Sequence, residues 1–187
     1  MRKKDDEKER SIKEAVINLI LQEGFHGASV SKIAKMAGVS PATVYIYYEN
    51  KENMLQDIYL EYSEEVYTHL IDRVNKGVSG PQRIEQLIRG YYDFILERRE
   101  IFNFVEQFAN CPSLASGCSG ERGICNLRKL LTEMKQNQIL KAYSEDNLLA
   151  VMLYPVKAIA LDIHKSSAEK EVLLQELIKL ILDAILV

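Results

Sequence analysis

Residues 29–51 read SVSKIAKMAGVSPATVYIYYENK, and this stretch decides the fold of the first part of the chain. Its apolar positions first recur three and four residues apart, which is the spacing of one helix face. Gly38 is placed to end that helix, and Pro41 suits the first position of a second one, where a missing N–H costs nothing. Ser29 and Ser40 stand directly before the two helices and predict N-caps. Two short helices joined by a tight turn are typical of a helix-turn-helix.

The second helix of such a motif enters the major groove when the motif binds DNA. Val44 and Tyr48 lie four residues apart and are expected to pack inward. That leaves Ala42, Thr43, Ile46 and Tyr47 for the groove, with Tyr45 at the flank. The hydroxyls can bond base edges or phosphates, and the methyl groups of Ala42 and Ile46 can touch thymine methyls. A core role for the tyrosines is the alternative, but three aromatics in four residues cannot all face inward.

The longer run from Ala28 to Leu55, ASVSKIAKMAGVSPATVYIYYENKENML, resembles the TetR family of transcription regulators in its small, apolar, aromatic and lysine positions. The resemblance is strong over residues 8–60. It implies a homodimer whose recognition helices occupy successive major grooves of a palindromic double-stranded DNA operator. It also implies repression as the default, with release by a small-molecule effector. The predicted DNA-binding residues are Ser29, Ser40, Pro41, Ala42, Thr43, Tyr45, Tyr47 and Lys51.

The charge of this region is low for a DNA-binding domain. Residues 1–60 contain nine lysines and arginines against nine aspartates and glutamates, and the whole chain has a net charge of −3. The second helix carries no Arg, Lys, Asn or Gln, which excludes bidentate reading of guanine or adenine from it. Tyrosine hydroxyls, Lys51 at a helix N-terminus and two-fold pairing are therefore expected to share the binding. We expect a shallow salt dependence as a result.

The remaining sequence has the period of helices throughout, so the predicted fold class is all-α. An N-terminal three-helix DNA-binding domain, residues 1–50, precedes a larger helical effector-binding and dimerisation domain, residues 51–187. Helical patterns cover residues 8–23, 51–75, 82–98, 101–110, 121–138, 144–165 and 166–187. Asn50, Ser144 and Ser166 are predicted N-caps, and Pro155 predicts a bend. Residues 77–81 form a predicted hinge.

Aromatic residues concentrate after this hinge, where four of the five phenylalanines lie between Phe94 and Phe108. Such rings can line a pocket for an apolar or cationic molecule. The predicted effector-binding residues are Tyr91, Phe94, Phe102, Phe104, Phe108 and Tyr154. Ordinary core packing is the alternative for the same residues, and it is the commoner arrangement.

The C-terminal helix is apolar on nearly all sides, because nine of residues 177–187 are hydrophobic. A helix buried on one face would not need this. Together with the preceding helix it predicts a four-helix interface between two copies of the chain. The predicted dimerisation residues are Met152, Val156, Ile159, Leu177, Ile181 and Ile185. The alternative is a helix central to its own monomer.

Several other classes of protein are not expected. No apolar run approaches the roughly 18 residues of a membrane span. The charged first ten residues do not have the pattern of a signal peptide, and together with three cysteines they predict a cytoplasmic protein with free thiols. No cofactor, metal site or enzyme motif is expected. A thiol sensor built on Cys111, Cys118 and Cys125, or a helical protein-interaction adaptor, stays open as an alternative function.

Overall fold

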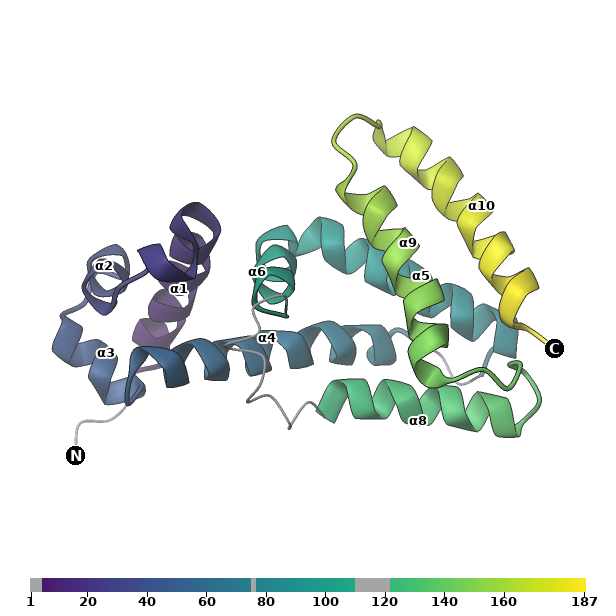
Figure 1. The fold of residues 1–187 in the computed structure, drawn as a ribbon, viewed down its shortest axis with the longest axis horizontal. Helices are drawn as coiled ribbons and strands as arrows, with labels where there is room; N and C mark the ends of the chain where they lie inside the picture. The colour runs from purple at the N-terminus through teal and green to yellow at the C-terminus, as the bar shows by residue number, and fades with distance from the viewer. Residues whose placement is uncertain (1–4, 75–76, 110–121) are drawn as a thin grey trace. The chain divides into compact units, whose positions relative to one another are not determined.

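The computed structural model describes residues 5–74, 77–109 and 122–187, and these residues are predominantly helical (Figure 1). The helices are α1 Asp6–Gly27, α2 Val30–Met36, α3 Pro41–Tyr47, α4 Lys51–Asp72, α5 Gly80–Glu97, α6 Arg99–Ala109, α8 Arg122–Gln136, α9 Glu145–Leu161 and α10 Ser167–Ile185. Within the described ranges the only strand-like pairing is an isolated bridge between Leu140 and Leu186. The predicted all-α class is confirmed. None of the described helices is long and apolar enough to cross a membrane.

The chain divides into two compact units. The first unit holds the described residues of 1–63 and 100–120, and the second holds those of 64–99 and 121–187. α4 contributes residues to both units. α6 belongs to the first unit although it follows α5 of the second unit in sequence. The predicted domain boundary between residues 50 and 51 stays a prediction.

Polar side chains begin the helices where the sequence predicted them. In each case the side-chain oxygen accepts a backbone N–H three residues ahead, which satisfies one of the donors that a helix start leaves open. The predicted N-caps are confirmed at Ser29, Ser40, Asn50, Ser144 and Ser166. At α10 the arrangement is reciprocal, because the Glu169 carboxylate also accepts the Ser166 N–H at 2.8 Å.

Two helix ends differ from the expected ones by four residues. α1 extends to Gly27, although its geometry breaks at Gly24, where φ is 70° and ψ is 178°. That conformation is open essentially to glycine alone, so the expected stop appears as a kink. α9 ends at Leu161 and not at Lys165. The Asp162 carboxylate accepts the His164 N–H at 2.8 Å, a local bond that competes with the helix.

Each unit has its own apolar core. In the first unit, one face of α1 packs with buried residues of α2, α3, α4 and α6, among them Ile12, Ile20, Ile33, Val44 and Ile58. In the second unit, α5 packs against α9 and α10, which lie side by side in Figure 1. The cores bury the positions that recur at helical spacing, as amphipathic helices require.

Candidate DNA-binding interface

The turn between α2 and α3 is built by Gly38, whose φ of 68° favours glycine. The Gly38 N–H donates to the Lys35 carbonyl, and the Val39 N–H donates to the Ala34 carbonyl at 2.9 Å. This pair of bonds closes the end of α2 as a Schellman motif. Buried Ile33 on α2 and Val44 on α3 lie in the same core. The predicted helix-turn-helix is therefore present in the first unit.

Val44 and Tyr48 lie inward as predicted, whereas two of the four residues predicted for the groove are not fully exposed. Val44 and Tyr48 are buried, at 1% and 7% exposure. Tyr45 is 56% exposed and Ile46 is 42% exposed. Pro41 and Ala42 are exposed as well, whereas Thr43 and Tyr47 are half-buried. The exposed side of α3 therefore consists mainly of apolar groups.

The hydroxyl groups of Ser40 and Thr43 form hydrogen bonds at the start of α3. Ser40 Oγ accepts the Thr43 N–H at 3.1 Å. The two hydroxyl oxygens also share a hydrogen bond at 2.9 Å. The predicted contacts of Ser40, Thr43 and the α2 cap Ser29 with DNA stay predictions.

Tyr47 fastens the end of α3 to the beginning of α1. Its hydroxyl donates to the Asp5 carbonyl at 3.0 Å and accepts the Asp5 N–H at 2.9 Å. Asp5 is the N-cap of α1, because its side chain accepts the Glu7 N–H. A phosphate contact from Tyr47, as the sequence predicts, would require its hydroxyl to leave Asp5.

Lys51, the first residue of α4, also forms a hydrogen bond within its own unit. Its Nζ donates to the Phe25 carbonyl at 2.7 Å, in the last turn of α1. On α2, Lys32 pairs with Glu23 at 2.5 Å. Lys35 is exposed, and within the described residues no ion pair involves it. Lys32 and Lys51 are therefore bonded to protein groups, which leaves fewer cations for phosphate contacts.

Five of the six aromatic residues predicted to bind an effector are packed as core in this structure. Phe102, Phe104 and Phe108 belong to α6 of the first unit, where the Phe108 ring stacks on Tyr59 at 4.2 Å. Tyr91 and Phe94 are buried in α5 of the second unit, and Tyr154 on α9 is 68% exposed. The five buried rings are therefore packed as the core-packing alternative expects. Their contact with an effector stays a prediction.

The predicted dimerisation residues need correction. Met152, Val156, Ile181 and Ile185 are at most 2% exposed inside their own unit, so they present no surface to a partner. Ile159 and Leu177 are half-buried. The prediction was wrong for the four because α9 and α10 pack on α5 and on each other, which takes their most apolar stripe into the monomer core. The buried stripe agrees with the alternative, in which the C-terminal helix is central to its own monomer.

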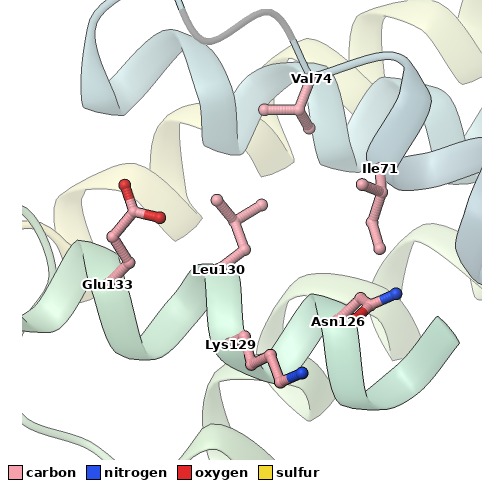
Figure 2. A pocket seen from close by; sticks show the side chains of 6 residues that line it. All are labelled: Ile71, Val74, Asn126, Lys129, Leu130 and Glu133. Carbon is pink, nitrogen blue, oxygen red and sulfur yellow. The ribbon is translucent and has the colours of Figure 1, made fainter. Parts of the chain in front are cut away.

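A hollow of about 200 Å³ lies between the end of α4 and one face of α8 in the second unit (Figure 2). Ile71, Val74 and Leu130 provide its apolar surface, and Figure 2 shows Leu130 projecting from α8 toward the α4 side. Asn126, Lys129 and Glu133 add polar groups from α8. The sequence did not predict this site, because no local motif indicates a groove between two helices.

His69 is a half-buried histidine of the second unit. Its Nε2 is buried and has no hydrogen-bond partner among the described residues. Its ring lies edge-on to Phe94, with the ring centres 5.2 Å apart. Burial and the nearby Arg73 lower the pKa of His69 below its ordinary value, and Glu97, Asp93 and Glu65 oppose that shift. The folded protein therefore favours the neutral ring.

The stability of the second unit should accordingly depend on His69 in mild acid. A histidine with a lowered folded pKa stabilises the fold fully above its unfolded pKa of about 6.5, and that contribution is lost as the pH falls through the folded pKa. We expect the urea midpoint to fall between about pH 7.5 and about pH 5.5, and to fall less in His69→Gln. Identical pH dependence in the two proteins would contradict a lowered pKa.

The cysteine prediction is only partly within the described residues. Cys125 on α8 is a free, exposed thiol. Cys111 and Cys118 lie outside the described residues, so the thiol-sensor alternative stays a prediction. Among the residues described, no group of histidine, cysteine and acidic side chains could hold a metal ion.

A capped helix-turn-helix with an exposed second helix, followed by a helical unit, defines a DNA-binding transcription regulator. Comparison with known proteins identifies the family. Residues 12–58 match the model of bacterial regulatory proteins of the tetR family. A crystal structure of a TetR family transcription regulator from Marinobacter aquaeolei VT8 is 27% identical and covers 100% of this chain and 99% of its own, with a TM-score of 0.81. Residues 12–58 therefore form a DNA-binding domain of the tetR family, and the whole chain is similar to a solved TetR family transcription regulator.

Two further similarities involve fatty-acid regulators. The fatty acid metabolism regulator protein of Bacillus subtilis is 27% identical over 82 residues, which are 44% of this chain and 42% of that protein. The chain thus matches less than half the length of this curated relative. The structure of the transcriptional regulator FadR from Bacillus subtilis in complex with stearoyl-CoA is 16% identical, with a TM-score of 0.66 over 93% of this chain and 97% of its own. At that identity the likeness concerns the fold.

Proposed function

We propose that the chain is a repressor that binds a palindromic operator as a homodimer and leaves it when a small-molecule effector binds. In this proposal residues 1–50 bind DNA and residues 51–187 bind the effector and dimerise. The observation that carries it is the exposed face of α3, held outward by the buried Val44 and Tyr48. A recognition helix needs one side that packs against its own domain and another side that is exposed to the DNA bases.

Dimerisation is supported by exposed apolar side chains on α9 and α10. Val151 and Tyr154 lie on α9 and are 43% and 68% exposed. Val172 and Leu180 lie on α10 and are 57% and 66% exposed. Each pair has helical spacing, so each helix offers an apolar stripe besides the one that it buries. Two such stripes on adjacent helices suit a two-fold interface that pairs the same patch from both copies.

A charge in that surface should separate the two copies. We expect Leu180→Glu to sediment as a monomer and to lose operator affinity, because a carboxylate would be buried against apolar groups of the partner. The fold should persist, since Leu180 is 66% exposed in the single chain. Leu96→Glu, at a residue of α5 that is 47% exposed, is the matched control and should stay dimeric. A dimeric Leu180→Glu protein would place the interface elsewhere.

The hollow between α4 and α8 is the effector site that we propose. Its apolar surface and the charged groups of Lys129 and Glu133 suit a small amphipathic molecule. At about 200 Å³ it is smaller than the roughly 300–1,000 Å³ typical of pockets for drug-sized ligands, so a long acyl chain fits it poorly. α4 also begins with Lys51, so one helix carries residues of both proposed sites.

Selection of bound sequences from a random DNA duplex library tests the DNA-binding proposal. We expect enrichment of an inverted repeat that full-length protein shifts as a dimer–DNA complex. A thermal-shift screen of small amphipathic molecules then tests the effector, and a hit should release the protein from the selected duplex. Leu130→Trp, which fills the hollow, should abolish the thermal shift without weakening DNA binding. Failure to enrich any sequence would overturn the proposal.

A further inference from the structure

The structure points to the chemistry that α3 recognises in its operator. We propose that Ala42, Tyr45 and Ile46 form an apolar reading face that recognises the C5-methyl groups of thymines in the major groove. This inference rests on the proposed operator binding and specifies what is read there.

Two of the three hydroxyl side chains of α3, those of Thr43 and Tyr47, form hydrogen bonds within the protein, whereas Tyr45 is 56% exposed. The Thr43 hydroxyl is paired with Ser40 Oγ at 2.9 Å. The Tyr47 hydroxyl holds both the carbonyl and the N–H of Asp5. A hydroxyl has a single hydrogen to donate, so Tyr47 could donate to a base only by giving up the Asp5 carbonyl, which would lose its partner. Hydrogen-bond donation from Tyr47 to a base is therefore disfavoured.

Apart from the Tyr45 hydroxyl, the exposed groups of α3 that remain for base contact are apolar. Ala42, Tyr45 and Ile46 stand at i, i+3 and i+4, so they share one face of α3. All three are exposed, and Ile46 keeps 42% of its surface in solvent. A β-branched isoleucine holds its methyl groups in few rotamers, so little freedom is lost when it enters the groove.

Thymine is the base that this surface can recognise. Of the four bases only thymine presents a methyl group in the major groove, next to its O4 acceptor, while the others present hydrogen-bonding groups alone. Cytosine and adenine would place their amino groups against Ile46 without an acceptor, which costs desolvation. The reading face therefore selects thymine by attraction and disfavours amino-bearing bases by exclusion.

The test replaces single thymines by deoxyuridine, which removes the methyl group and leaves base pairing unchanged. The probe is the duplex selected from the random library, titrated with full-length protein by fluorescence anisotropy. For wild type we expect the dissociation constant to rise about fourfold at a contacted thymine, the value for one methyl group removed from water. Placing 5-methylcytosine at that position should bind more tightly than cytosine.

The variant Ile46→Ala assigns the contact to a residue. Its affinity should be lower on the thymine duplex, and its response to deoxyuridine should fall below about twofold, because the methyl group has lost its partner. Leu96→Ala, an exposed leucine on α5, is the control and should retain the full response. Circular dichroism should show an unchanged fold for both, since each side chain is partly in solvent.

The outcomes separate this inference from the proposed function. A selected duplex in which every thymine tolerates deoxyuridine would overturn the reading of methyl groups and leave operator binding in place. A full deoxyuridine response in Ile46→Ala would overturn the assignment to the reading face. Absence of any enriched duplex would instead defeat the proposed function on which the inference rests.

Discussion

Ala42→Glu is expected to abolish operator binding without weakening the fold. Ala42 is exposed in the first turn of α3, directly after Pro41. A carboxylate there faces the helix N-terminus, which stabilises the helix by about 0.3–1 kcal/mol. On DNA the same carboxylate meets the phosphates, and like charges brought together at an interface cost several kcal/mol. We therefore expect the dissociation constant to rise more than about 100-fold.

The neutral variant Ala42→Gln separates charge from size. It has nearly the shape of the glutamate, so it should lose much less affinity and should respond less to salt. Anisotropy titrations of both variants, with urea unfolding of each, measure affinity and stability independently. Equal losses in the two variants would indicate a steric effect. An unchanged dissociation constant in Ala42→Glu would show that α3 does not face DNA.

Phe108→Ala is expected to destabilise the first unit by about 3–5 kcal/mol, the range for removal of a buried aromatic ring. Phe108 is fully buried, stacks on Tyr59 at 4.2 Å and meets the edge of Phe25 with ring centres 5.7 Å apart. Its removal leaves a cavity and strips both neighbours of their contacts. DNA binding should be lost at temperatures where the unit unfolds.

The same variant decides between the two interpretations of the aromatic cluster. Urea unfolding followed by circular dichroism gives the stability change, and Phe108→Leu, which keeps most of the apolar volume, should lose much less. If Phe108 instead lined an effector pocket, stability would change by less than about 1 kcal/mol and the response to the effector would change most. That result would contradict the packed core.

The features of the fold that could be predicted are those with a local signal in the sequence. The turn at Gly38 and the caps at Ser40 and Ser166 depend on interactions within a few residues of the chain, so their chemistry is visible in the sequence. The inward positions Val44 and Tyr48 followed from the helical period for the same reason. The end of α9 was misplaced because the competing bond from Asp162 is a weak signal beside a long apolar pattern.

Contacts between distant residues were not predictable in this way. Nothing near Tyr47 in sequence indicates that its hydroxyl bonds Asp5, and nothing near Lys51 indicates the Phe25 carbonyl. Burial of Met152 and Ile181 inside the monomer depends on how α9 and α10 pack on α5. Apolar residues suit a core and an interface equally, so their pattern alone cannot distinguish the two.

The sequence by itself determined that the chain is helical, where its DNA-binding motif begins and ends, and which face of α3 is buried. These features depend on periodicity and capping, which act over one or two helical turns. Only the tertiary structure decided that the Tyr47 hydroxyl is bonded to Asp5 and that Ile46 and its neighbours are left exposed. Hydrogen bonds over long sequence separations require the folded chain, and they determine which groups remain available to DNA.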